Sequence, residues 1–142
     1  MPRTRRIALV GHPHVVVARG NAGGDVFHDD EDLEGYLSTL RDLVREQVCT
    51  LYAFCLMRGE VRLVIQPRRL GLAQVIQRLH TAHARRMNHK LERHGHLFEG
   101  RFRSTLIPKD RLADAVRWVH LWPVRSGRVR RAEVYPWSSH RA

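Results

Sequence analysis

The sequence has few cysteines and no long hydrophobic run. Cys49 and Cys55 are its only cysteines, too few for a disulfide framework, and their spacing matches no zinc site. No apolar stretch reaches the roughly 18 residues of a membrane-spanning helix. The apolar residues 7–10, which follow a basic start, are too few for a secretory signal peptide. We therefore expect a cytoplasmic protein without a membrane partner, in which both cysteines are reduced core residues.

Acidic residues are scarce in the second half of the chain. The 142 residues include 25 Lys and Arg but only 14 Asp and Glu, a net charge of +11. Residues 1–66 hold eight Arg and nine acidic residues, whereas residues 67–142 hold seventeen Lys or Arg and five acidic residues. This asymmetry predicts a polyanionic partner, nucleic acid before an anionic membrane surface. Of the 25 cations 23 are Arg, a residue that grips phosphate and stacks on bases.

The length and the order of periodic segments predict one α+β domain over residues 1–142. Runs of β-branched or alternating apolar residues predict four strands: 14–18, 48–57, 60–65 and 104–107. Apolar residues at helical spacing predict three helices: 29–47, 72–90 and 108–127. Pro123 stops or bends the last helix if that helix does not continue to Gly127. The order β-α-β-β-α-β, with a C-terminal helix and a basic tail, is that of a ferredoxin-like split antiparallel sheet.

The predicted second helix carries cations on the faces that its apolar stripe leaves free. These cations, and two that precede the helix, are predicted DNA contacts: Arg68, Arg69, Arg78, Arg85, Arg86 and Lys90. No acidic residue lies between Glu60 and Glu92, whereas a merely solvated face usually mixes both signs. Phosphate contact is therefore favoured over a solvated face.

The loop over residues 95–103 interleaves aromatic residues with cations. Phe98 and Phe102 alternate with Arg101 and Arg103, a pattern typical of base stacking beside backbone contacts. We include both arginines among the predicted DNA contacts. The alternative for the phenylalanines is that they fill the core. Further along the chain, a basic run over residues 128–131 fits a phosphate contact.

Four short motifs follow one another along the chain. Residues 17–21 read Val-Ala-Arg-Gly-Asn, residues 95–102 read Gly-His-Leu-Phe-Glu-Gly-Arg-Phe, residues 120–127 read His-Leu-Trp-Pro-Val-Arg-Ser-Gly, and residues 135–139 read Tyr-Pro-Trp-Ser-Ser. With these motifs the chain resembles the REP-associated tyrosine transposases, which are IS200-like transposases of the His-hydrophobic-His superfamily. In that family the third motif reads His-Leu-Asn-Pro-Val-Arg-Ala-Gly.

The resemblance implies a fold and a chemistry. Members of the family nick and rejoin single-stranded DNA hairpins. Two His on either side of a hydrophobic residue hold a divalent metal such as Mg²⁺ or Mn²⁺, which polarises a phosphate. A tyrosine on a helix then attacks this phosphate and forms a phosphotyrosine link.

The sequence departs from the family where this chemistry is expected. The family reads Leu-Met-Pro-Asn-His-x-His-Leu, whereas residues 56–63 read Leu-Met-Arg-Gly-Glu-Val-Arg-Leu. Glu60 and Arg62 thus occupy the two ligand positions, and an Arg cannot bind a metal. On the second helix the expected tyrosine positions hold His83 and Arg86. We therefore predict no catalytic residue, no metal site and no cofactor.

Each replaced position leaves two interpretations open. In one interpretation, Arg62 and Arg86 supply the positive charge that the metal would supply, and they hold a DNA phosphate without cutting it. In the other, Glu60 and Arg62 form an ion pair on one face of the strand. His83 is a buried core residue or lines the former cleft. The His-Pro-His motif that ends at His14 is interpreted as packing at the start of a strand rather than as a metal site.

The sequence thus predicts a protein that binds single-stranded or hairpin DNA and has lost the nicking reaction. One alternative is an active enzyme with a rebuilt metal site, formed around Glu60, His83 or His14. Another is an RNA-binding module with a ferredoxin-like fold. A monomer and a homodimer both stay open.

Overall fold

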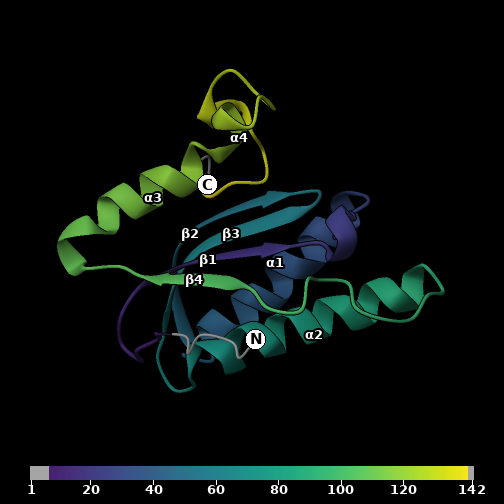
Figure 1. The fold of residues 1–142 in the computed structure, drawn as a ribbon, viewed down its shortest axis with the longest axis horizontal. Helices are drawn as coiled ribbons and strands as arrows, with labels where there is room; N and C mark the ends of the chain where they lie inside the picture. Colours follow the sequence, from purple (N-terminus) through teal and green to yellow (C-terminus); the bar gives the residue numbers. More distant parts are fainter. Residues whose placement is uncertain (1–6, 141–142) are drawn as a thin grey trace, which may run out of the picture.

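A four-stranded antiparallel sheet with helices on both faces forms the molecule (Figure 1). The computed structural model describes residues 7–140, so the basic start at residues 1–6 lies outside the described residues. The strands are β1 (His14–Arg19), β2 (Cys49–Met57), β3 (Glu60–Pro67) and β4 (Arg103–Leu106). The α-helices are α1 (Asp30–Arg45), α2 (Leu72–Lys90), α3 (Leu112–His120) and α4 (Trp122–Arg125). Short 3₁₀ turns are η1 (Asn21–Gly23), η2 (Lys109–Arg111) and η3 (Ala132–Val134).

The sheet confirms the predicted ferredoxin-like arrangement. Its strand order is β2-β3-β1-β4, so β1 lies between β3 and β4. Val17 of β1 is therefore opposite Arg62 on one side and opposite Arg103 on the other. This register brings together residues from the first half and the second half of the chain.

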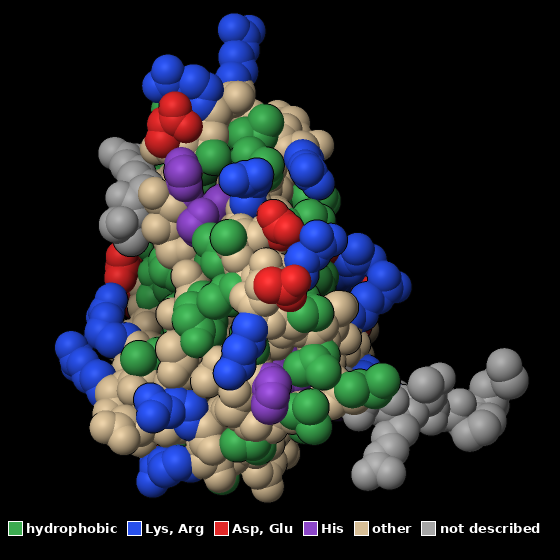
Figure 2. Space-filling view, turned by 90° about the vertical axis from the view of Figure 1, so that its left-hand side faces the viewer, with side chains coloured by type: hydrophobic (Ala, Val, Ile, Leu, Met, Phe, Trp, Pro, Cys, Tyr) green, Lys and Arg blue, Asp and Glu red, His purple; other side chains and the backbone are tan. Residues whose placement is uncertain are grey.

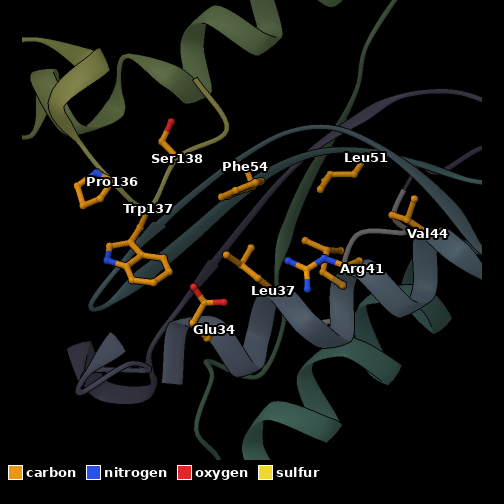
Figure 3. A pocket seen from close by; sticks show the side chains of 10 residues that line it. Glu34, Leu37, Arg41, Val44, Leu51, Phe54, Pro136, Trp137 and Ser138 are labelled. Carbon is orange, nitrogen blue, oxygen red and sulfur yellow. The ribbon is translucent and has the colours of Figure 1, made fainter. Parts of the chain in front are cut away.

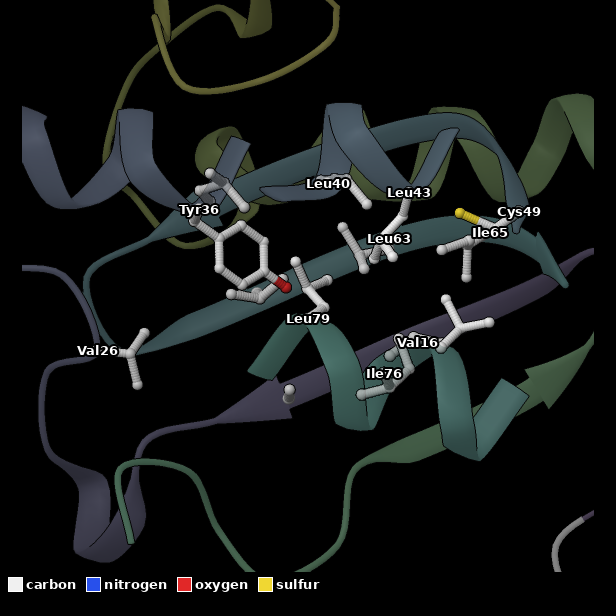
Figure 4. Close-up of a cluster of buried hydrophobic side chains, with 14 of the residues drawn as sticks. Val16, Val26, Tyr36, Leu40, Leu43, Cys49, Leu63, Ile65, Ile76 and Leu79 are labelled. Atoms are coloured by element: carbon white, nitrogen blue, oxygen red, sulfur yellow. The ribbon is translucent and has the colours of Figure 1, made fainter. Parts of the chain in front are cut away.

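The larger core lies between one face of the sheet and the helices α1 and α2. Val16, Leu63 and Ile65 of the sheet meet Leu40 of α1 and Leu79 of α2, and each is at most 1% exposed (Figure 4). These positions follow the alternation and the helical spacing that predicted the elements. None of the helices in residues 7–140 is both long and apolar enough to span a membrane.

The other face of the sheet is covered by α3, which contacts β2 and β3. Ala115 and Val119 of α3 pack against Ala53 and Val64 in a second, smaller core. The single helix predicted here is interrupted, because α3 ends at His120 and α4 begins two residues later. Pro123 lies in the first turn of α4, where its missing N–H is tolerated. The β1–β4 half of this face is more open, with exposed Arg103 and Thr105.

The C-terminal segment lies along the outer edge of β2, a pairing that the sequence did not predict. Leu56 donates its backbone N–H to the carbonyl of Trp137 at 2.9 Å, and Ser139 donates to the carbonyl of Phe54 at 3.0 Å. The Tyr135 hydroxyl donates to the carbonyl of Leu56. The Tyr-Pro-Trp-Ser-Ser motif therefore protects an edge strand that would otherwise expose unpaired backbone groups.

Two predictions about buried side chains are confirmed. Cys49 and Cys55 are free and buried, and burial raises their pKa to about 11 and about 12, respectively. His14 is fully buried at the start of β1, where its Nε2 accepts a hydrogen bond from the backbone of Leu9. All three are thus packing residues.

Candidate nucleic-acid interface

Two ion pairs meet at Glu60 on the sheet face that α3 covers. Glu60 and Arg62 are two residues apart on β3, so their side chains share this face, and Arg19 of β1 is directly opposite Glu60. Arg19 Nε donates to Oε1 of Glu60 at 2.8 Å, and Arg62 Nε donates to Oε2 at 2.7 Å. Both carboxylate oxygens are therefore held by arginines, which confirms the interpretation of positions 60 and 62 as an ion pair.

Two tryptophan rings hold Arg62 from the helical side. The guanidinium carbon is 4.2 Å from the ring centroid of Trp118 on α3 and 3.4 Å from that of Trp122 on α4. Such cation–π contacts contribute about 0.5 to 2 kcal/mol each. The Arg62 side chain is only 7% exposed as a result. The sequence analysis missed both tryptophans, although Trp122 stands where the resembling motif has Asn.

The residues at positions 60 and 62 do not fit a divalent metal. Glu60 supplies one carboxylate, whose oxygens already accept hydrogen bonds from two arginines. Arg62 has five N–H donors, no acceptor and a permanent positive charge. Within residues 7–140, no group of three His, Cys, Asp or Glu side chains is arranged to hold a metal ion.

The structure separates the two pairs of replaced positions. His83 and Arg86 are on α2, which packs on the opposite face of the sheet from Arg62. The interpretation in which Arg62 and Arg86 together hold one DNA phosphate is therefore wrong. Arg62 instead faces α3 and α4, through Trp118 and Trp122. The α3 residue that contacts Arg62 is Trp118, which has no nucleophilic group.

His83 is a core histidine rather than a residue of an open cleft. It is fully buried, its Nε2 donates to the carbonyl of Val26 at 2.7 Å, and its Nδ1 accepts from Arg86 at 3.2 Å. Burial lowers the pKa of His83 to about 4, so the ring is neutral at pH 7. The core interpretation of this residue is confirmed.

The predicted DNA contacts are not all on the surface. Five of them are exposed on α2 or just before it: Arg68, Arg69, Arg78, Arg85 and Arg86. Arg103 is exposed on β4, and Arg101 is half-buried beside it. Figure 2 shows one side of the molecule, on which Lys and Arg side chains are spread from top to bottom, with acidic side chains beside some of them.

Several of the predicted contacts have partners within the protein, including Arg86, and for Arg62 and Lys90 these partners decide their role. Arg62 is buried between Glu60 and the tryptophans, so it has little surface to offer a phosphate. Lys90 Nζ donates to Asp29 at 2.6 Å and to Asp32 at 2.8 Å, and these hydrogen bonds raise its pKa. Lys90 therefore ties the end of α2 to the start of α1. The structure corrects the predicted role of both residues as direct phosphate contacts.

The loop before β4 is anchored to the end of β1. Asn21 donates to the carbonyl of Leu97 at 2.9 Å, and Glu99 donates to that of Arg19 at 2.8 Å. Phe98 is half-buried and stacks on His80, with ring centroids 3.9 Å apart. Phe98 and Phe102 both pack against the larger core, so the core-filling interpretation of the phenylalanines is confirmed for their buried sides.

Two hollows lie on the α1–α2 side of the molecule. One, of about 600 Å³, lies between α1, β2 and the C-terminal segment, and Figure 3 shows Leu37, Phe54 and Trp137 among its lining residues. The other, of about 470 Å³, lies between α2 and the loop over residues 95–102. Only the second includes residues that the sequence analysis singled out as candidate nucleic-acid contacts.

Comparisons with known proteins agree with this architecture. The family model for IS200-like transposases matches residues 11–120. No curated protein matches the chain. The solved structure of a REP-associated tyrosine transposase bound to a REP hairpin is similar, with a TM-score of 0.79, 14% identity, and coverage of 99% of this chain and 84% of that chain. A putative transposase from Deinococcus radiodurans R1 is also similar, with a TM-score of 0.54, 17% identity, and coverage of 84% and 94%. At these identities the two structures establish a shared fold.

Proposed function

Because the chain belongs to the IS200-like transposase family, we propose that it binds single-stranded or hairpin DNA and does not nick it. The observation that supports the absence of nicking is the environment of the Arg62 side chain. Its guanidinium is ion-paired to Glu60 and covered by two tryptophan rings at the position where the resemblance implies a metal ligand.

The DNA-binding half of the proposal is supported by the charge distribution. The exposed arginines of α2 face solvent without an acidic residue among them, which favours contact with phosphates. The similar REP-associated transposase was solved with a REP hairpin, so a hairpin is the first substrate to test. We propose that residues 1–142 act as one domain, in the cytoplasm, either as a monomer or as a homodimer.

The loss of nicking follows from the chemistry of the replaced residues. Cleavage of a phosphodiester needs stabilisation of the developing charge and an activated nucleophile. The hydroxyls of Tyr36 and Tyr135 are engaged within the protein, with His80 and with the carbonyl of Leu56. Tyr52, on β2, donates to Gln66. No tyrosine is present on α3 or α4, the helices that face Arg62.

The alternative of a rebuilt metal site is not supported by the geometry. Glu60 is on the sheet face covered by α3, whereas His14 and His83 are buried on the side of α1 and α2. These three residues do not meet, so they cannot share one metal ion.

The deciding experiment incubates the full chain with labelled hairpin and single-stranded DNA in Mg²⁺ or Mn²⁺. We expect a shift in fluorescence anisotropy that reports binding, and neither a nicked product nor a covalent adduct on a denaturing gel. An adduct would contradict the loss of nicking. Tighter binding of a matched RNA than of the DNA, at the same salt concentration, would favour the RNA-binding alternative.

A further inference from the structure

A third hollow, of about 500 Å³, lies on the α3–α4 side of the sheet, between α3 and the basic segment that follows α4. Three arginines, two histidines and, among residues 7–140, a single acidic residue contribute to its lining: Arg117, Arg130, Arg131, His120, His140 and Glu133. Cations that gather around a concave surface strengthen the positive potential inside it. The lining therefore indicates a site for an anion.

Two of these arginines have no partner within the described part of the chain. Arg117 is exposed on α3 and Arg130 is exposed after α4, and neither guanidinium forms an ion pair or a hydrogen bond with another residue of 7–140. The third arginine, Arg131, is 3.1 Å from Glu133, so the carboxylate in the lining already has a cation beside it. Arg117 and Arg130 are therefore available to an external anion.

The backbone of the basic segment is held against α4. Arg128 and Val129 both donate to the carbonyl of Pro123, at 2.9 Å and 3.2 Å. Val129 packs against the smaller core and Ala132 is buried, whereas Arg130 between them faces solvent. The backbone that carries Arg130 is thus positioned before any ligand binds, which lowers the entropic cost of binding.

The two histidines add hydrogen-bonding groups to the hollow. His120 is half-buried, its Nε2 is 2.7 Å from the hydroxyl of Ser139, and its ring centroid is 5.1 Å from that of the exposed His140. Burial and the neighbouring His140 lower the pKa of His120, so its ring is mostly neutral at pH 7. The fixed positive charge of the hollow therefore comes from its arginines.

We propose that this hollow binds a backbone phosphate of the DNA through Arg117 and Arg130. This inference rests on the proposed function, since it presumes that DNA is the ligand. Guanidinium groups form charge-assisted hydrogen bonds with phosphate oxygens, and such contacts position a strand without reading its sequence. Because α2 is on the other face of the sheet (Figure 1), the hollow is a second DNA-contact surface, separate from the exposed arginines of α2.

The first test removes the two unpaired cations. Arg117→Gln/Arg130→Gln should weaken binding of a single-stranded oligonucleotide about tenfold or more, and should lower the slope of log K against log salt by about 0.7 for the lost phosphate contact. The control is Arg41→Gln/Arg45→Gln, which removes two exposed cations from α1. An effect no larger than that of the control would overturn the site.

A second test changes the charge of the hollow and leaves its arginines in place. Ala113→Glu adds a carboxylate to the lining from an exposed position of α3, and Ser38→Glu adds the same charge to an exposed position of α1. Both variants have the same net charge, but only the first places a negative charge beside the proposed phosphate. Ala113→Glu should therefore weaken DNA binding more than Ser38→Glu does. Equal weakening would assign the effect to net charge and contradict the site.

Tripolyphosphate distinguishes failure of the site from failure of the proposed function. We expect it to raise the melting temperature of the unmodified chain more than that of Arg117→Gln/Arg130→Gln. If the unmodified chain binds no DNA while this difference is present, the proposed function is wrong and the hollow takes free phosphates. If neither DNA nor tripolyphosphate binding depends on the two arginines, the site itself is overturned.

Discussion

Arg62 is a permanent charge in an environment where an unpaired charge is costly. Glu60 neutralises it at 2.7 Å, and two rings of Trp replace water on its other side. A buried ion pair adds little to stability by itself, but removal of one partner leaves the other charge uncompensated. Removal of Glu60 and removal of Arg62 therefore leave different charges without a partner.

The first prediction compares Glu60→Gln with Arg62→Met. Glu60→Gln leaves Arg62 buried without an anion, and we expect a loss of about 3 kcal/mol in the free energy of unfolding. Arg62→Met leaves Glu60 paired with the exposed Arg19 and keeps an apolar side chain against the tryptophans, so the loss should be smaller. Urea unfolding of the two variants measures both values. An equal or larger loss for Arg62→Met would show that the tryptophan contacts, not the ion pair, dominate.

The second prediction concerns pH. Burial lowers the pKa of His83 to about 4 from 6.5, and that of His80 to about 3. The unfolded chain therefore binds protons that the folded chain does not bind, and stability falls as the pH falls from about 6.5 towards 4. For His83 alone we expect a loss of about 2 kcal/mol between pH 7 and pH 5.

Thermal unfolding at pH 7 and pH 5 tests this expectation in three proteins: the unmodified chain, His83→Gln and His89→Gln. His89 is exposed at the end of α2, so its replacement should leave the pH dependence as it is. The replacement of His83 should reduce the difference between the two melting temperatures. A parallel pH dependence in all three proteins would mean that other groups cause it.

At the scale of the element, α2 has separate buried and exposed sides. Its apolar stripe, with Leu79 and Met87, faces the larger core, and Arg78 and Arg85 face solvent. The third prediction is that Arg78→Gln/Arg85→Gln weakens binding of single-stranded DNA and flattens its salt dependence. Each lost phosphate contact should lower the slope of log K against log salt by about 0.7.

The matched control for these α2 substitutions is Arg41→Gln/Arg45→Gln, which removes two exposed cations from α1. Fluorescence anisotropy over a range of salt concentrations gives the slope for each variant. If the α1 and α2 variants reduce the slope equally, the effect comes from net charge and not from a surface on α2.

The C-terminal segment acts as an additional edge strand. Its backbone is hydrogen-bonded to Phe54 and Leu56 of β2, and the isolated bridge between Cys55 and Ser138 continues this pairing. The fourth prediction is that a chain truncated after Val134 loses stability and self-associates through the exposed β2 edge. Thermal unfolding and light scattering measure the two effects. Tyr135→Phe, which removes only the hydroxyl, should cost about 1 kcal/mol and leave the chain unassociated.

Elements defined by a local pattern could be predicted, and contacts between distant segments could not. The spacing of Leu40 and Leu79 with their neighbours was sufficient for α1 and α2, because each helix presents one apolar stripe to the sheet. Nothing local to Arg62 indicates that tryptophans from α3 and α4 cover it. The two interpretations of His83 stayed open for the same reason, since helical periodicity shows that a face is buried but not which side of the sheet it meets.

At the scale of the whole molecule, the two faces of the sheet carry different groups of residues. Its α1–α2 side holds the larger core and the hollow beside Phe98, and its α3–α4 side holds Glu60 and Arg62. At the end of β1, the Arg19 side chain is paired with Glu60 on the α3–α4 side, and its backbone carbonyl accepts the hydrogen bond that anchors the loop before β4. Part of the positive charge behind the net +11 is therefore internal, at Arg62, and the rest of the molecule's cations include many that face solvent.

The cation at the centre of the α3 side is covalently part of the chain. A guanidinium cannot be removed by a chelator, nor exchanged when the supply of divalent ions changes. The proposed DNA binding uses the exposed arginines and no metal at positions 60 and 62, so its affinity in EDTA should equal that in millimolar Mg²⁺ once ionic strength is matched. Titrations in the two buffers measure this. Under the proposed function, DNA would be released by competing anions, as at high salt, and not by chelation of a divalent ion.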